Sequence, residues 1–184
     1  LYILLPIALI FALGLAKLGV PQNLNQYSTA KLLEPVVVTS VVAGKNVVKT
    51  ITTQTIPMGP IASQEAIKMV GTNGGGFFNA NSAHPYENPS AISNFFEMLA
   101  ILIIPGALCF TFGSMVSDKR QGWALYATMM LVFVVCAICL MLAESHGNPS
   151  FKQFNIDQIR NTFQSGGNME GKETRFGIFG SSLF

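Results

Sequence analysis

The run PIASQEAIKMVGTNGGGFF, residues 60–78, places a short helical segment directly before a glycine loop. Ser63 is a suitable N-cap, Glu65 lies favourably in the first turn, and Gly71 is the expected end of the helix. The C-terminal end of the helix therefore points at the loop, where its partial negative charge stabilises a cation. An anion would require the opposite end of a helix. This arrangement favours a cation site over a phosphate site.

The loop itself offers a row of backbone carbonyl groups. Gly74, Gly75 and Gly76 lack a Cβ atom and can adopt positive φ angles, so neighbouring carbonyls can turn toward one axis. Carbonyl oxygens arranged in this way replace the hydration shell of the ion in potassium-channel selectivity filters. The alternative interpretation is a flexible surface turn. The position of the loop between apolar runs favours the filter interpretation over this alternative. The sequence therefore predicts a re-entrant helix followed by a filter loop.

Three apolar runs surround this segment. They cover 1–16, 98–116 and 123–142 and contain no charged residue. The second and third runs are long enough to cross the ~30 Å hydrocarbon core of a membrane as helices, although Pro105 is expected to kink the second. The first run starts at Leu1 without the basic flank or cleavage site of a signal peptide. We expect it to be a truncated spanning helix in a fragment of a longer protein.

Composition agrees with a membrane protein. Half of the 184 residues are hydrophobic and 11% are charged, whereas an average soluble protein has about 25% charged residues. The net charge of +2, without a stripe of Lys and Arg, excludes a nucleic-acid-binding protein. Cys109, Cys136 and Cys139 lie inside apolar runs, where we expect small buried hydrophobic residues and no redox or zinc site.

Lys119 and Arg120 lie in the short connection between the second and third runs. The positive-inside rule places this connection on the cytoplasmic side, so that 21–89 and the residues from Glu144 onward lie outside. The outer stretch 31–56 is rich in Val and Thr, a composition that predicts short strands or an extended loop.

We interpret the following charged residues and histidines as structural. Glu65 and Lys68 are three residues apart on the predicted helix and can pair with each other. Glu97 precedes the second apolar run and is expected at the membrane interface. His84 and His146 lack a second ligand at helical spacing, so neither predicts a metal site.

The stretch 166–173 resembles a phosphate-binding loop of the form GxxxxGK[ST]. Glu173, however, occupies the position where a hydroxyl must bind Mg²⁺, and no apolar strand precedes the stretch. A membrane enzyme that binds a nucleotide through Lys172 is thus an alternative from a different functional class, and we do not favour it.

Longer motifs extend beyond the glycine loop. GTNGGGFFNANSAHPYENP (71–89) is followed by NFFEMLAILIIPGALCFTFG (94–113), and further motifs are GVPQN (19–23), DKRQG (118–122), ESHGNP (144–149) and NMEGKETRFG (168–177). With these motifs the chain resembles the potassium-binding A subunits of the Kdp potassium-transporting ATPases over practically its whole length.

The resemblance implies an all-α membrane protein of potassium-channel-like repeats, each a helix, a pore loop and a helix, with one full repeat and part of the next. It implies that the second of four filter strands consists of Gly71, Thr72, Asn73, Gly74, Gly75 and Gly76. The expected order is a truncated transmembrane helix (1–18), an extracytoplasmic segment (19–60), a pore helix with its filter loop (61–90), a transmembrane helix (95–116), a cytoplasmic turn (117–122), a transmembrane helix (123–142), and an extracytoplasmic segment with the start of the next pore helix (143–184).

The same resemblance implies a function. Such a subunit binds extracellular K⁺ and passes it through the membrane to a P-type ATPase B subunit, which uses ATP and Mg²⁺, with a small C subunit as a further partner. It would be a non-catalytic, multi-pass protein of the bacterial inner membrane, with no catalytic residue, no cofactor of its own and no metal other than K⁺. The alternative is a subunit of a K⁺ channel or a Trk-type K⁺ symporter, because a filter alone does not separate a pump from these.

Overall fold

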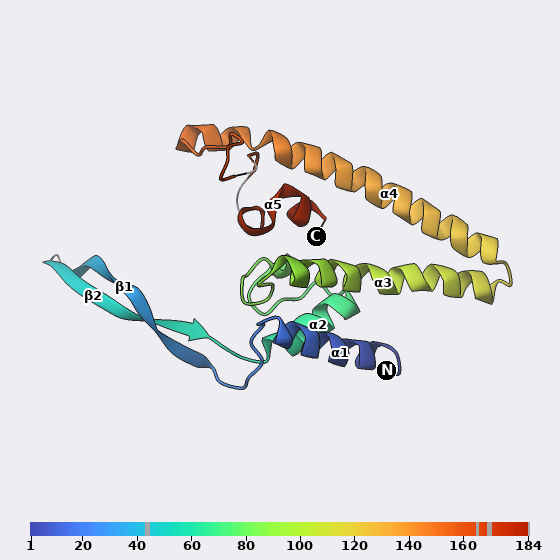
Figure 1. Ribbon diagram of the computed structural model, residues 1–184, viewed down its shortest axis with the longest axis horizontal. Coiled ribbons are helices and arrows are strands. Elements are labelled where there is room, and N and C mark those ends of the chain that lie inside the picture. Colours follow the sequence, from blue (N-terminus) through green and yellow to red (C-terminus); the bar gives the residue numbers. More distant parts are fainter. Residues whose placement is uncertain (43–44, 165, 169–170, 184) are drawn as a thin grey trace.

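The computed structural model describes residues 1–42, 45–164, 166–168 and 171–183 and is mostly helical (Figure 1). Its elements are α1 (Leu4–Lys17), β1 (Tyr27–Val42), β2 (Lys45–Pro57), α2 (Ile61–Gly71), η1 (Ala80–Ser82), α3 (Ala91–Met115), α4 (Lys119–His146), η2 (Pro149–Phe154) and α5 (Glu173–Ser182). The expectation of an all-α chain is therefore corrected by a two-stranded sheet.

Helix α2 is wedged between α1 and α3. Its apolar residues recur at helical spacing, so that Ile61 and Ala66 are buried against Leu15 of α1. On the neighbouring face Val70 packs with Ala100 of α3. With 11 residues at about 1.5 Å each, α2 is too short for a ~30 Å membrane core.

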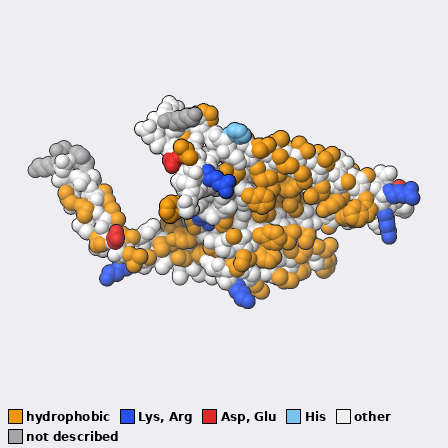
Figure 2. Space-filling model, turned by 45° about the horizontal axis from the view of Figure 1, so that its top comes forward, with side chains coloured by type: hydrophobic (Ala, Val, Ile, Leu, Met, Phe, Trp, Pro, Cys, Tyr) orange, Lys and Arg blue, Asp and Glu red, His pale blue; other side chains and the backbone are white. Residues whose placement is uncertain are grey.

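The long helices α3 and α4 form an antiparallel hairpin, and both are long and apolar enough to cross a membrane. Gly113 and Gly122 allow the two backbones to touch at the closed end, since a Cβ atom on Gly113 would lie 2.9 Å from the nitrogen of Gly122. Figure 1 shows the helices diverging toward the other end, where α5 lies between them. Hydrophobic side chains cover most of the helical face in Figure 2.

The connection between α3 and α4 is shorter than the predicted turn at 117–122. Asp118 accepts a hydrogen bond from the N–H of Arg120 at 2.9 Å and caps α4, which therefore begins at Lys119. Helix α4 continues to His146, and α3 runs through Pro105 without an interruption in its helical assignment.

The N-cap prediction at Ser63 is wrong. Helix α2 begins three residues earlier than an N-cap at Ser63 would place it, with Pro60 at the capping position. The Ser63 hydroxyl donates to the carbonyl of Pro60 at 3.0 Å, and its N–H donates to Oε1 of Gln22 at 2.9 Å. Ser63 thus ties α2 to the segment that follows α1.

Strands β1 and β2 form an antiparallel hairpin that projects from the helices (Figure 1). The pairing begins at Tyr27 and Pro57, and the register shifts between Lys31 and Val36. The prediction of strands or extended chain at 31–56 thus corresponds to a paired hairpin.

Candidate functional site

The glycine loop begins where α2 ends, at Gly71 as predicted. Thr72 follows in the left-handed conformation with φ 49°, and its N–H donates to the carbonyl of Met69 at 3.4 Å. The N–H of Asn73 donates to the carbonyl of Lys68 at 3.4 Å. These two bonds satisfy the end of α2 and turn the chain into the loop.

Backbone N–H groups in and directly after the loop donate hydrogen bonds to side-chain oxygens of the protein. Gly75 donates to Oδ1 of Asn73 at 3.1 Å, and the N–H groups that follow the loop donate to a buried carboxylate described below. By contrast, in the hydrogen bonds of residues 1–42, 45–164, 166–168 and 171–183, no donor reaches the carbonyl oxygens of 72–76. All residues of 71–76 are exposed. The loop therefore presents free acceptors on its open side, which is what a dehydrated cation requires.

Glu87 is the buried carboxylate behind the loop, and its side chain has no exposed surface. Phe77 and Phe78 donate their N–H groups to Oε1 at 2.8 and 3.0 Å, and Asn79 donates to Oε2 at 3.3 Å. Lys68 Nζ lies 3.8 Å from Oε1 and supplies a compensating charge. Three consecutive donors and one cation thus hold this carboxylate.

Lys68 also forms the predicted pair with Glu65, at 2.6 Å between Nζ and Oε2. Glu65 accepts a second bond from the hydroxyl of Ser82 on η1. Glu97 on α3 is fully buried within the protein, and its place at the membrane interface stays a prediction. Neither oxygen of Glu97 finds a hydrogen-bond donor in the described part of the chain.

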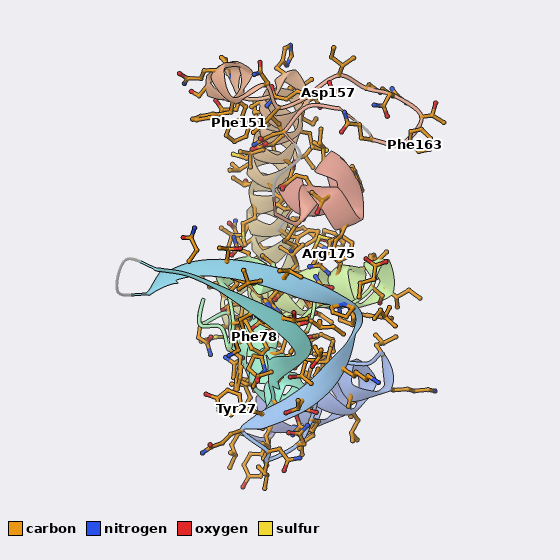
Figure 3. The ribbon with its side chains drawn as sticks, turned by 90° about the vertical axis from the view of Figure 1, so that its left-hand side faces the viewer. Tyr27, Phe78, Phe151, Asp157, Phe163 and Arg175 are labelled. Carbon is orange, nitrogen blue, oxygen red and sulfur yellow. The ribbon has the colours of Figure 1, made fainter. Side chains whose placement is uncertain are left out.

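Two basic residues at the start of α5, Lys172 and Arg175, reach the chain that follows the loop, and Arg175 is labelled in Figure 3. Lys172 Nζ donates to the carbonyl of Asn81 at 2.8 Å. Arg175 donates to the carbonyls of Ala83, at 2.6 Å, and of Asn88. Burial lowers the pKa of Lys172 to about 8, and the charge of Glu97 opposes this shift. Lys172 therefore binds a main-chain carbonyl inside the fold, which agrees with the interpretation that the stretch 166–173 is not a phosphate-binding loop.

An aromatic group supports the loop from the side. Phe78 stacks on His84 with a centroid separation of 4.4 Å and contacts Tyr86 at 5.9 Å. His84 is therefore a packing residue, and the described residues contain no group of three His, Cys, Asp or Glu able to hold a metal ion. The cysteines are free, but Cys136 and Cys139 are exposed on α4, contrary to the expectation of burial.

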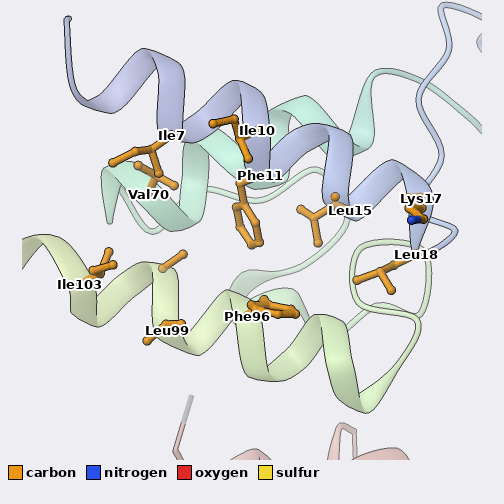
Figure 4. Close-up of a pocket in the computed structure, with 12 residues that line it drawn as sticks. Ile7, Ile10, Phe11, Leu15, Lys17, Leu18, Val70, Phe96, Leu99 and Ile103 are labelled. Atoms are coloured by element: carbon orange, nitrogen blue, oxygen red, sulfur yellow. The ribbon is translucent and has the colours of Figure 1, made fainter.

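Two hollows adjoin these elements. A small one of about 190 Å³ adjoins the glycine loop and is lined by Thr72, Gly74 and Gly75 together with Lys68, whose charge is balanced by Glu65 and Glu87. A larger one of about 600 Å³ lies among α1, α2 and α3 (Figure 4). Apolar side chains such as Phe11, Phe96 and Ile103 dominate its lining, so it offers no ion site. The candidate site is therefore the open side of the loop.

Sequence reasoning did not identify Glu87 or the role of Arg175. The three donors on Glu87 lie eight to ten residues before it, a separation that matches no helical or strand period. The chain returns because Asn81 and Ser82 adopt left-handed φ angles of 52° and 47° within η1. The one available signal was the acidic residue in the ENP sequence after the loop.

Comparison with known proteins gives a consistent picture. A family profile described as "KdpA: Potassium-transporting ATPase A subunit" matches residues 1–184. Proteins named "Potassium-transporting ATPase potassium-binding subunit" from Herminiimonas arsenicoxydans and Janthinobacterium sp. (strain Marseille) are each 54% identical over 197 residues, covering 100% of this chain and 33% of the relative. The protein of that name from Erwinia tasmaniensis is 54% identical over 184 residues, with 100% and 29% covered. The chain thus spans about a third of the length of the curated relatives it matches.

Proposed function

Since the chain belongs to the family of potassium-transporting ATPase A subunits, we propose that it forms one K⁺-selecting loop of such a subunit, with the ion bound at Gly71 to Gly76. The loop would be the second of four filter strands. Thr72, Asn73 and Gly74 are the foremost candidates for ion contact.

The observation that carries this proposal is the asymmetry of the loop backbone. The N–H groups of Thr72, Asn73 and Gly75 donate within the protein, while in the described part of the chain no donor reaches the carbonyl oxygens of 72–76, whose residues are all exposed. The C-terminal end of α2 adds partial negative charge on the same side. A cation that loses its water can therefore exchange it for fixed oxygens.

The proposed membrane arrangement places α1, α3 and α4 across the bacterial inner membrane as a multi-pass protein, with α2 re-entrant. Irregular backbone is tolerated at membrane depth where it lines a cavity, as a filter does. Lys119 and Arg120 would mark the cytoplasmic side. Trp123 packs against Phe110 with centroids 4.9 Å apart, close to that end of the hairpin, as expected for an aromatic belt.

In the proposed mechanism the loop binds extracellular K⁺ and passes it into the membrane. ATP hydrolysis belongs to a partner, the P-type ATPase B subunit with its Mg²⁺, and a small C subunit completes the complex. The residues of this chain would select and position the ion and would hold no cofactor. Specificity arises because carbonyl oxygens fixed by the protein exchange with the hydration shell of one ion size better than another.

The test is the K⁺-dependent ATPase activity of the full complex carrying Gly74→Asp, titrated with K⁺ and then with Rb⁺. Gly74 has φ +70°, and a Cβ atom there meets nothing within 4 Å, so the new carboxylate stands in the open space before the loop. We expect a several-fold higher half-saturation for K⁺ and a changed response to Rb⁺. Gly177→Asp, where φ is +69° and a Cβ atom also meets nothing, is the matched control for the added side chain and its backbone strain, and its half-saturation values should stay as in wild type.

Wild-type titrations with both ions in Gly74→Asp would contradict the assignment of the loop. Potassium uptake into vesicles that continues without ATP would favour the channel or symporter alternative.

A further inference from the structure

The carboxylate of Glu87 holds three successive peptide groups directly after the glycine loop. Its bonds to the N–H groups of Phe77, Phe78 and Asn79 are 2.8 to 3.3 Å long. Each of these peptide groups is planar and trans, so its carbonyl points opposite to its N–H. The carbonyl of Gly76, which shares a peptide group with the N–H of Phe77, is therefore directed away from Glu87.

The negative charge of Glu87, as well as the position of its oxygens, determines how strongly it holds the three N–H groups. Two carboxylate oxygens serve three donors, and hydrogen bonds to an ionised acceptor are roughly twice as strong as neutral ones. The carboxylate is fully buried, and Lys68, itself 3% exposed, balances its charge from 3.8 Å at Oε1, the oxygen that also accepts from Phe77 and Phe78. A neutral amide in this position could accept with only one of its two terminal atoms.

Glu87 is itself held in place by a rigid surrounding. Its N–H and that of Asn88 both donate to the carbonyl of His84, at 3.0 and 3.1 Å. The side chain of Asn88 donates to Asn94 at 2.8 Å and accepts from Ser93 at 2.7 Å, both on α3. Through these bonds the carboxylate keeps a fixed position relative to α3.

We propose that Glu87 is a positioning residue that sets the direction of the Gly76 carbonyl at the end of the glycine loop and thereby the discrimination between K⁺ and Rb⁺. The inference rests on the proposed function, because it assigns a determinant of selectivity to the same loop. Glu87 does not touch the ion. It acts through the peptide groups that it orients.

The decisive experiment is Glu87→Gln in the full complex, compared by K⁺ and Rb⁺ titration of ATPase activity. Glutamine keeps an oxygen for Phe77 and Phe78 but turns an NH₂ group toward the N–H of Asn79, so the Asn79 bond is lost and the other two lose their charge assistance. We expect the K⁺ half-saturation to rise about tenfold and the ratio of K⁺ to Rb⁺ half-saturation to change. Glu34→Gln, an exposed position on β1, is the control and should leave both values unchanged.

A merely structural role for Glu87 would lower the yield of assembled complex without moving the ion ratio. A wild-type ratio in assembled Glu87→Gln, alongside a changed ratio in Gly74→Asp, would overturn this inference and leave the proposed function standing. Wild-type ratios in both variants would overturn the filter assignment itself.

Should Glu87→Gln not assemble, Glu87→Asp decides the question. Aspartate keeps the charge but withdraws it by one methylene, so at least one of the three bonds is lost. A smaller change of the ion ratio in the same direction is expected, and a wild-type ratio would overturn the inference.

Discussion

At the scale of single residues, adjacent glycines of the loop have different roles. A Cβ atom on Gly76 would overlap the carbonyl oxygen of Asn79, whereas on Gly75 it would lie 3.4 Å from Oδ1 of Asn73 and fit. Gly76 is thus required by a close backbone approach, and Gly75 is not. The sequence alone does not distinguish the two glycines in this respect.

We therefore expect Gly76→Ala to be much more damaging than Gly75→Ala. Overpacking against backbone destabilises by about 1–3 kcal/mol, and here it also displaces the segment held by Glu87. Gly76→Ala should lower the yield of folded complex and raise the K⁺ half-saturation, while Gly75→Ala stays within about twofold of wild type. Purification yield and K⁺ titration of both variants check this, and equal effects would refute it.

The residue-scale comparison also shows what sequence could predict. Gly71 ends α2 and Glu65 pairs with Lys68, because both depend on spacing along a single helix. The prediction at Ser63 failed because partners distant in sequence accept the first N–H groups of α2: Ala62 donates to the carbonyl of Pro21, and Ser63 donates to Gln22, 41 residues away. The role of Glu87 stayed hidden for the same reason, since its donors are brought together only by the folding of η1.

At the scale of helices, the hairpin of α3 and α4 depends on one close crossing. A Cβ atom on Gly122 would lie 2.8 Å from the carbonyl oxygen of Cys109, whereas one on Gly106 would lie 3.6 Å from the ring of Tyr126. The first distance requires a shift of backbone, and the second is ordinary van der Waals contact. The two glycines therefore form a matched pair on one interface.

Gly122→Ala should separate the two helices at their crossing, at a cost of about 1–3 kcal/mol. Gly106→Ala should be neutral or slightly stabilising, since alanine is the better helix former by about 1 kcal/mol. Thermal unfolding of the purified complex distinguishes them, with a lower midpoint expected only for Gly122→Ala. A midpoint lowered equally in both would contradict the crossing as the sensitive point.

The uninterrupted apolar runs of the chain were sufficient to locate these helices but not their ends. Apolar runs predicted 98–116 and 123–142, while α3 and α4 extend to Ala91 and His146. Polar residues complete each helix: Ser90 and Ser93 form a capping box at the start of α3, and Asp118 caps α4. Hydropathy measures the lipid-facing part of a helix, whereas caps set its length.

At the scale of the whole molecule, α5 joins two regions that lie far apart in the sequence. Lys172 and Arg175 bind the segment after the glycine loop, and Asn94 of α3 donates to the carbonyl of Gly180 at 2.9 Å. These contacts connect the glycine loop of one proposed repeat with the start of the next. Stability of this junction should therefore depend on the protonation of Lys172.

The sign of that dependence follows from the lowered pKa of Lys172, about 8 in the fold against an ordinary value of 10.5. The folded state releases the proton first, so the unfolded state binds more protons between these values and stability rises with pH across this window. Below about pH 8 the penalty for burying the charge is fully present. Relative to Lys172→Met, wild-type complex should gain thermal stability between about pH 8 and pH 10, and parallel curves would contradict this.

The basic residues of α5 bind main-chain oxygens, at Asn81 by Lys172 and at Ala83 by Arg175. Every amino acid carries such an oxygen, so a point substitution at Ala83 leaves the acceptor where it was, and one at Asn81 does so where the new residue tolerates the left-handed φ of 52°. Losing or adding one residue between them would instead displace an acceptor by a full chain unit of about 3.8 Å. This stretch should therefore tolerate amino-acid substitutions over evolutionary time but not insertions or deletions.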